Sequence, residues 1–312
     1  MQTPIYNFEE SKPITQGAMT PFNVNAYNII RDLYLEFTNN GAPATLANCQ
    51  SSIGRIVVLI NGMNALDVSL SQLTDLFTYL GTRVQQTELV NVFSLNMGRL
   101  LYKAGILRDE FAWRCGKAGE TNPAKKISSL VVQVYANSTV TNITDVQLYS
   151  SRLNFEAEWN DSYIQFNNNV QSFSATGQSQ VNTLPKNAND LFLLAIAYNG
   201  GGVISQGETL INNTNVTRAI SLNVNNAIGN LEGYGEIDGA FVHNFCNGAG
   251  NSGLYVSDIT SELSVRTTFS SAPSKGYDLP VLKVHNCPTR LKNIVNSSNL
   301  IALDTLEVGQ TA

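Results

Sequence analysis

Charged side chains are scarce in this 312-residue chain. They make up 14% of the residues, against about a quarter in an average soluble domain. The 24 acidic and 19 basic residues give a formal net charge of −5. Nucleic-acid binding requires clustered Lys and Arg facing the phosphates, and this composition argues against such clusters. We therefore expect no direct contact with nucleic acid.

Long apolar runs and closely paired cysteines are also missing, and we expect no cleaved leader sequence. The longest apolar run, Leu191 to Tyr198, has the length of a strand and falls well short of the roughly 18 residues of a transmembrane helix. The polar segment from Gln2 to Thr20 contains Pro and argues against a cleaved signal peptide. The four cysteines form no close pair, so we expect reduced thiols: Cys49, Cys115, Cys246 and Cys287.

Neutral polar residues replace charge in this sequence. Asn alone accounts for 37 of the 312 residues. A surface rich in Asn, Ser and Thr has little long-range field to repel further copies of the same chain. A genome-wide bias towards Asn is the alternative explanation.

Alternation of apolar and polar residues is the dominant pattern. In the segment Asp32–Thr38, Leu33, Leu35 and Phe37 fall on one face, and Asn40-Gly41 then forms a turn. This pattern predicts a strand. Similar segments are 55–60, 89–95, 127–135, 152–159, 163–166, 191–198, 254–268 and 279–285.

One helix is clearly indicated. Ser69 or Ser71 can cap its start, the apolar residues between Leu70 and Leu80 have helical spacing, and Gly81 ends it. A second short helix or turn is predicted within residues 98–109. With so few helices between so many strands, the pattern favours β-sandwiches over a parallel sheet.

The two halves of the chain resemble each other. Asp32-Leu33-Tyr34-Leu35 has a counterpart in Asp190-Leu191-Phe192-Leu193, 158 residues later, and each is followed by an Asn-Gly turn. We also matched Ile127–Tyr135 with Leu279–His285 as the closing strands of the two halves. These matches predict one module used twice, with chance alternation as the alternative. The predicted organisation is an N-terminal arm (1–21), a first sandwich (22–140), a second sandwich (141–290) and a C-terminal tail (291–312).

The segment Ile53–Gly62, followed by Ser71–Leu76, is similar to the first barrel of a known family. These are the double jelly-roll major capsid proteins of tailless icosahedral bacteriophages with an internal membrane. The Asp32 strand, Leu184–Tyr198 and the closing segments 258–269 and 278–284 fit the same order, so the resemblance covers residues 28–287.

The resemblance implies an all-β fold of two tandem eight-stranded jelly-roll barrels with a few short helices. It also implies a homotrimer that forms a pseudo-hexagonal block in the virion capsid, made in the host cytoplasm and without enzymatic activity. The expected partners are neighbouring capsomers, a penton protein and, through the terminal arms, the internal viral membrane. The resemblance implies no catalytic residue, cofactor or metal ligand.

The histidines and cysteines are the strongest candidates for chemistry. His243-x-x-Cys246 and His285-x-Cys287 contain suitable ligands for tetrahedral zinc. On a strand, residues two apart share a face and residues three apart do not. Only His285 and Cys287 converge, so we expect neither a zinc site nor a Cys–His nucleophile pair.

The best carboxylate cluster consists of Glu156, Glu158 and Asp161. On a strand, Glu156 and Glu158 share a face, as the nucleophile and acid of a β-sandwich glycosidase would. Known sandwich glucanases show Glu-x-Asp-x-x-Glu, from which this cluster departs at its second and third acids. A solvated face opposite Phe155 and Trp159 explains the same pattern, and a glycosidase is the least favoured function.

Other motifs are weaker still. Gly116-Lys117-Ala118 lacks the remaining parts of a P-loop, and Gly233-x-Gly235-x-x-x-Gly239 lacks the spacing of a dinucleotide-binding turn, so we expect loops at both places. Oxygen ligands for a structural Ca²⁺ are available, without a spacing that selects a set: Asp145, Asp238 and Asp258.

A carbohydrate- or receptor-binding protein, such as a lectin or viral spike, is the main alternative function. Its sugar-stacking candidates are Trp113, Trp159 and Tyr163. Such aromatic residues more often belong to a core or an interface.

Overall fold

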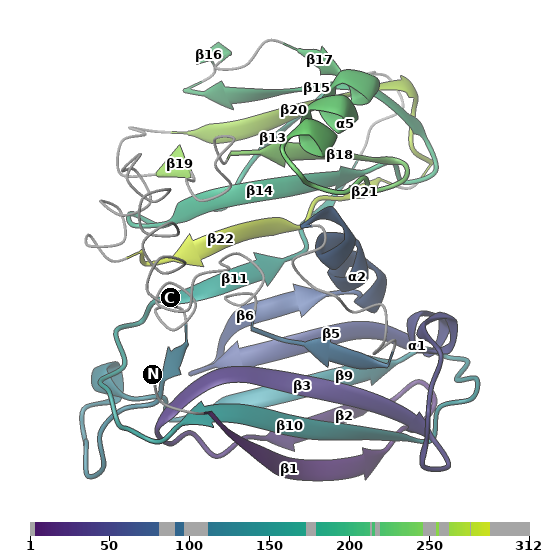
Figure 1. The fold of residues 1–312 in the computed structure, drawn as a ribbon. Coiled ribbons are helices and arrows are strands. Elements are labelled where there is room, and N and C mark those ends of the chain that lie inside the picture. The colour runs from purple at the N-terminus through teal and green to yellow at the C-terminus, as the bar shows by residue number, and fades with distance from the viewer. Residues whose placement is uncertain are drawn as a thin grey trace, which may run out of the picture. The chain divides into compact units, whose positions relative to one another are not determined.

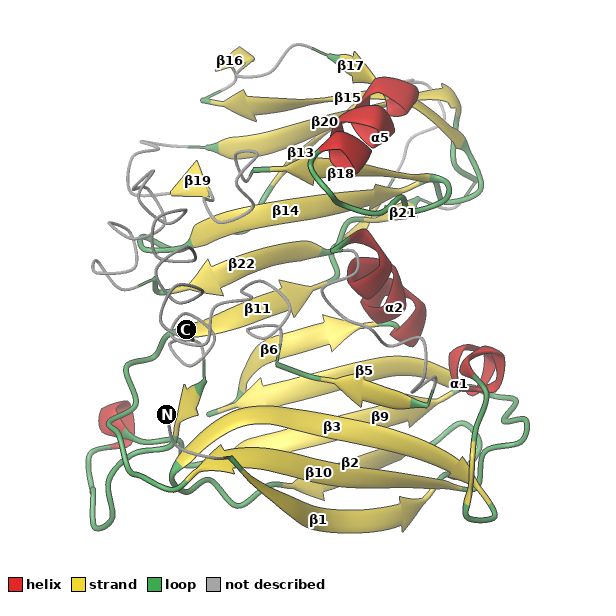
Figure 2. Ribbon diagram, viewed as in Figure 1, coloured by secondary structure: helices red, strands yellow, loops and turns green. Residues whose placement is uncertain are grey.

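Strands dominate the computed structural model (Figure 2). It describes residues 4–80, 91–96, 112–172, 179–212, 214–215, 219–245, 254–255, 262–274 and 276–287. The chain divides into two compact units. Unit 1 comprises Met1–Phe77 and Thr82–Ile164, and unit 2 comprises Thr78–Gly81 and Gln165–Ala312.

Unit 1 contains two antiparallel sheets (Figure 1). In one, β10 lies between β1 and β3, and β4, β7 and β8 pair with β3; in the other the order is β6-β5-β9-β2. The strands are β1 (Ile5–Pro13), β2 (Met19–Asn23), β3 (Ile29–Asn39), β4 (Ala42–Pro43), β5 (Ile53–Ile60), β6 (Met63–Val68), β7 (Val92–Ser94), β8 (Trp113–Arg114), β9 (Leu130–Ala136) and β10 (Asp145–Leu153). The helices are α1 (Leu46–Ser52), α2 (Leu70–Tyr79), whose last two residues belong to unit 2, and the 3₁₀ helix η2 (Pro123–Lys125).

Unit 2 also has two main sheets, with orders β11-β22-β14-β18 and β13-β20-β15-β17. Of the shorter strands, β16 pairs with β15, β19 pairs with β14, and β12 and β21 pair with each other. The elements are β11 (Tyr163–Asn167), which begins at the end of unit 1, β12 (Val170–Gln171), β13 (Ser179–Thr183), β14 (Leu191–Tyr198), β15 (Val203–Ile211), β16 (Thr214–Asn215), β17 (Ile220–Ser221), α5 (Leu222–Leu231), β18 (Ala240–Asn244), β19 (Leu254–Tyr255), β20 (Leu263–Ser271), β21 (Tyr277–Asp278) and β22 (Val281–His285).

The two units use the same strand order. We number the main described strands of each unit from 1 to 8, leaving out β4 and β8 in unit 1 and β12, β16, β19 and β21 in unit 2. Both units then have sheets ordered 1-8-3-6 and 2-7-4-5. Two antiparallel sheets that pair early strands with late ones in this way form a jelly roll. Each unit therefore has jelly-roll topology.

The repeat predicted from Asp32 and Asp190 is confirmed at the level of topology, because β3 and β14 are both third strands. The match of Ile127–Tyr135 with Leu279–His285 is wrong. The first segment contains β9, a seventh strand, whereas the second contains β22, an eighth strand whose counterpart is β10. Alternation identifies a strand but not its neighbours, so two apolar strands near the ends of the halves look equivalent.

The division into units differs from the predicted boundary at residue 140. Strand β10 was placed in the second sandwich, yet it pairs with both β1 and β3 of unit 1. The N-terminal segment is extended, as predicted, but residues 5–13 form β1 within the sheet instead of a separate arm. At a bulge in β1, Glu9 forms a buried ion pair of 2.7 Å with Arg152 of β10. The tail at 291–312 lies outside the described residues.

The predicted alternation in β3 is confirmed. Leu33, Leu35 and Phe37 are fully buried, and Tyr34 and Glu36, on the opposite face, are half-buried. The predicted strand at 152–159 is wrong beyond Leu153, where β10 ends; of the remaining residues only Ala157 forms a bridge, to Gly116.

The predicted helix at Leu70–Leu80 is confirmed as α2. Ser69 and Gln72 form a reciprocal capping box, in which the N–H of Gln72 donates to Ser69 Oγ and the N–H of Ser69 donates to Gln72 Oε1. Helices α1 and α5 were not predicted, and the segment at 98–109 lies outside the described residues. None of the helices in the described part of the chain is long and apolar enough to cross a membrane.

Candidate functional site

The two candidate histidines lie on strands that are not neighbours. His243 lies on β18 and His285 on β22, and β14 lies between these two strands in the sheet. Cys246 lies outside the described residues. Within those residues, no three His, Cys, Asp or Glu side chains are grouped closely enough to hold a metal ion. The described cysteines are buried free thiols: Cys49, Cys115 and Cys287.

Burial controls protonation at these side chains. His243 lies fully inside unit 2, where burial lowers its pKa to about 3. Its Nε2 lies 3.3 Å from Thr267 Oγ1, and its ring lies against Phe241 with 4.8 Å between centroids. Burial likewise raises the pKa values of Cys49 and Cys115 to about 12. At neutral pH these groups are a neutral imidazole and two protonated thiols.

The carboxylates of the predicted glycosidase cluster hold a loop in place. Glu156 Oε2 accepts a hydrogen bond of 2.9 Å from the N–H of Ala118. Glu158 Oε1 lies 3.5 Å from Lys125 Nζ and 3.8 Å from Lys117 Nζ in exposed ion pairs. Asp161 occupies a left-handed turn position, with φ +54. These contacts stabilise the junction between two loops of unit 1.

The glycine motifs are loops, as expected. An added Cβ at Gly116 would lie 2.7 Å from Lys126 Cβ, so packing accounts for this glycine. Gly233 and Gly239 adopt left-handed turns after α5. Among the calcium candidates, Asp145 accepts a hydrogen bond from Thr144 Oγ1, Asp238 is exposed in a turn, and Asp258 lies outside the described residues.

The aromatic candidates for sugar stacking are core residues. Trp113, Trp159 and Tyr163 are each at most 5% exposed. Trp159 stacks on Tyr163 with 5.9 Å between ring centroids. Side chains this deeply buried offer no platform for a sugar, which removes the residue-level support for a lectin.

A buried ionic cluster in unit 2 was not predicted. The carboxylate of Asp190, just before β14, lies 2.7 Å from Lys283 Nζ and 3.2 Å from His285 Nδ1. It also accepts hydrogen bonds from the N–H groups of Asn187 and Asn286. Burial alone would raise the pKa of Asp190, but the hydrogen bonds from His285 and Lys283 and the charge of Lys283 lower it below its ordinary value. A lysine inside the apolar segment Leu279–His285 was the sequence signal for this pair.

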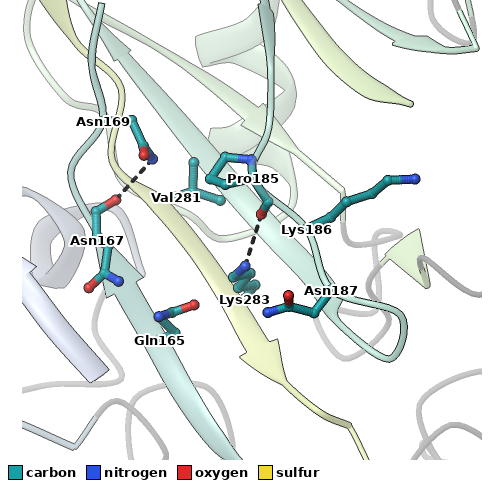
Figure 3. A pocket seen from close by; sticks show the side chains of 8 residues that line it. All are labelled: Gln165, Asn167, Asn169, Pro185, Lys186, Asn187, Val281 and Lys283. Atoms are coloured by element: carbon teal, nitrogen blue, oxygen red, sulfur yellow. Dashed lines mark hydrogen bonds between the residues drawn. The ribbon is translucent and has the colours of Figure 1, made fainter. Parts of the chain in front are cut away.

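Lys283 also lines a polar pocket of about 320 Å³ (Figure 3). Its ammonium donates to the carbonyl of Pro185 at 2.9 Å as well as to Asp190. The amides around it belong to residues on β11 and in the loops near β12 and β14: Gln165, Asn167, Asn169 and Asn187. Asp190 neutralises Lys283, and Lys186 is the other charged residue that lines the pocket. Because the remaining polar groups of its lining are amides, we assign no reaction to it.

Exposed apolar side chains mark two surfaces. On the outer face of unit 1, Phe8, Tyr149 and Tyr34 lie opposite one another across β1, β10 and β3. Phe8 is 59% exposed and contacts Tyr149 edge to face. In unit 2, the exposed apolar residues of α5 are Val224, Ala227, Ile228 and Leu231. Contact surfaces, rather than a reactive centre, are therefore the candidate functional feature.

Comparisons with known proteins find the fold but no close relative. No protein-family model matches the sequence, and no curated protein does. Among solved structures, the major capsid protein P2 of bacteriophage PM2 is similar, with TM-score 0.70 and 12% identity over 92% of this chain and 99% of that one. The chain has a double jelly-roll fold.

Other double jelly rolls match along nearly their whole length. A chain in the atomic structure of Sulfolobus Turreted Icosahedral Virus has TM-score 0.64 and 10% identity, with 98% of this chain and 97% of that one covered. The Faustovirus major capsid protein has TM-score 0.56 and 6% identity, with 91% and 90% covered. At these identities the likeness establishes the shared fold, whereas the function has to be argued from the surface of this chain.

Proposed function

We propose that this double jelly-roll protein is a viral major capsid protein with a structural role. The observation that carries the proposal is the occurrence of two jelly rolls of identical strand order in one chain, aligned over 92% of its length with the PM2 capsid protein. The sparse charge and the exposed apolar patches suit a protein that contacts many copies of itself.

The finer features of this proposal concern assembly. Three chains supply six jelly rolls, which form a pseudo-hexagonal homotrimer in an icosahedral shell. Its partners are neighbouring capsomers, a penton protein and an internal membrane, and its location is the virion. The low charge, high Asn content and length resemble those of the lipid-containing phage that infects Flavobacterium, which favours a bacteriophage origin. Because residues 5–13 belong to a sheet, membrane contact through a free N-terminal arm is no longer part of the proposal.

Size-exclusion chromatography with light scattering tests the proposal on the purified full chain. We expect a species of three times the 33.9 kDa chain mass. Electron microscopy of the concentrated protein, or of the protein expressed with its viral partners, should then show hexagonal blocks or shells. A chain that stays monomeric at micromolar concentrations and forms no particle in either setting would overturn the capsid role.

A further inference from the structure

Helix α5 presents its apolar stripe to the outside. Val224, Ala227, Ile228 and Leu231 have the i, i+3, i+4, i+7 spacing of one helix face, and all four are exposed. Leu231 is 88% exposed. The opposite stripe, which is the more buried one, consists of Leu222, Asn225, Asn226 and Gly229.

This orientation reverses the usual one. A surface helix of a globular protein buries its apolar stripe and leaves its polar side in water. In α5, Asn225 donates from Nδ2 to the carbonyl of Val242, and Gly229 is buried. Leu222 packs against the core of unit 2, and polar or small residues make the other contacts of the buried stripe. Among the described residues, the apolar side chains of the opposite stripe remain exposed.

The corresponding helix of unit 1 shows the usual orientation. Helix α2 occupies the same place in the strand order, between the fifth and sixth strands, and is also ten residues long. Its apolar residues Leu70, Leu73, Leu76 and Phe77 are at most 6% exposed. Among the described residues, one of the two helices at this position in the module has a buried apolar stripe and the other has an exposed one.

The charges around α5 indicate what covers it. The helix contains no charged residue, and over residues 219–245 the only formal charges at neutral pH are Glu232, Glu236 and Asp238. An apolar stripe beside acidic groups does not complement nucleic acid or an anionic membrane. It does complement a protein surface with few charges. This chain has such a surface, since 14% of its residues are charged, and an assembly contains many copies of it.

The size of the stripe argues for a multi-part contact. Ten helical residues span about 15 Å, and one face of a helix about 10 Å wide then offers on the order of 150 Å². This area is a small part of the roughly 800 Å² that each partner buries in a standard interface. The stripe is too small to hold a lone partner tightly. It suits one element of a larger, repeated contact between identical chains.

We propose that the α5 stripe is an interface with a second copy of this chain. The inference rests on the proposed capsid function and adds to it a specific surface. In the assembled state Ile228 and Leu231 are buried against the neighbouring chain.

A triple variant, Val224→Asn, Ile228→Asn and Leu231→Asn, tests the inference. The stripe is exposed in the monomer, so the variant should keep the wild-type circular dichroism and melting temperature. Its trimer peak in light scattering should be lost at concentrations where the wild type is fully assembled. The matched control, Asn223→Ser with Asn230→Ser, changes exposed residues of the same helix outside the stripe and should assemble normally.

A photo-crosslinking residue at Leu231 gives a second measurement that does not depend on loss of assembly. Irradiated oligomers should yield covalent dimers on a denaturing gel, and the same residue at 223 should yield far fewer. The α5 inference is overturned if the wild type and the triple variant assemble equally well and position 231 gives no adduct between chains. The stripe would then contact lipid or another protein. If the wild type itself does not assemble, the proposed function fails first.

Discussion

Both jelly rolls place a buried cation on their eighth strand, but they neutralise it differently. In unit 1, Arg152 of β10 pairs with Glu9 at the bulge of β1 and stacks over Tyr27 at 4.1 Å. In unit 2, Lys283 of β22 pairs with Asp190, next to the third strand. The jelly-roll strand order requires apolar inner faces and correct strand pairing. The comparison shows that the same order can contain different buried ion pairs.

The helices between the fifth and sixth strands differ in a second way. Helix α2 contributes its apolar stripe to the interior, whereas α5 turns the same kind of stripe outwards. The two units thus share one strand order, but the connecting helix packs into the interior in unit 1 and offers a contact surface in unit 2. Four experiments break or sharpen this comparison.

The largest expected effect is at Asp190. Asp190→Asn leaves the buried ammonium of Lys283 without its carboxylate, which should destabilise unit 2 by roughly 3–5 kcal/mol. The related change Asp32→Asn in unit 1 weakens hydrogen bonds from Ser94 Oγ and the N–H of Asn96 and should cost about 1–2 kcal/mol.

Urea unfolding can separate the two units in this experiment. The chain has two tryptophans, Trp113 and Trp159, and both are buried in unit 1, so their fluorescence reports on that unit. Circular dichroism reports on both units. Equal losses for Asp190→Asn and Asp32→Asn would contradict the larger effect expected from leaving Lys283 without its carboxylate.

The two helices provide the second test. Leu76→Asp places a charge in a fully buried position on α2 and should lower the free energy of unfolding by about 3 kcal/mol or more. Ile228→Asp, on the exposed stripe of α5, should change it by less than about 0.5 kcal/mol. Thermal unfolding at a concentration where both proteins are monomeric measures the difference. A large loss for Ile228→Asp would show that the monomer already covers α5.

Acid should weaken unit 2 before unit 1, because the fully buried neutral imidazole of His243 lies in unit 2. The folded state holds His243 neutral with its pKa lowered to about 3, whereas the unfolded chain takes up a proton near the ordinary value of 6.5. The stabilisation from this residue is therefore complete above pH 6.5 and decreases as the pH falls towards 3.

The expected loss is about 1.4 kcal/mol per pH unit below the unfolded pKa. It should be measured between roughly pH 6 and pH 4.5, before the carboxylates of the unfolded chain take up protons. His243→Gln keeps a hydrogen-bonding group near Thr267 and should show a nearly flat profile in this range. A wild-type profile as flat as that of His243→Gln would contradict the buried neutral imidazole.

The smallest effect concerns the helix caps. Ser69→Ala removes one half of the capping box of α2 and should cost about 1 kcal/mol. Ser221→Ala removes the single hydrogen bond to the N–H of Val224 at 3.3 Å and should cost about 0.5 kcal/mol. Denaturant titration of both variants tests whether reciprocal capping makes α2 the more firmly fixed helix.

Local patterns predicted a large part of the fold. Strand β14 and the apolar face of β3 followed from alternation, and the turns at Asn40-Gly41 and Asn61-Gly62 have the positive φ angles that Asn-Gly favours. Alternation missed β1, β2, β6, β13, β15 and β18, and it predicted only the last two residues of β10. Parts of β1 and β10 turn ionic or hydroxyl groups such as Glu9, Ser150 and Arg152 into the unit, which blurs their alternation.

The candidate functional surface was only partly accessible to sequence analysis. The spacing of Val224, Ala227, Ile228 and Leu231 indicates an amphipathic helix, and that signal was available. Which way the stripe faces depends on Asn225, Gly229 and the strands that they contact, so periodicity alone could not show it.

The sequence by itself determined the all-β character, the duplicated third strand, helix α2 and the scarcity of charge, because each depends on neighbouring residues or on composition. Only the tertiary structure decided that residues 5–13 complete a sheet, that Lys283 meets Asp190, and that α5 faces outwards. Those features join residues far apart in the chain. Their physical cause is the pairing of strands and the burial of charge, which no local pattern of residues specifies.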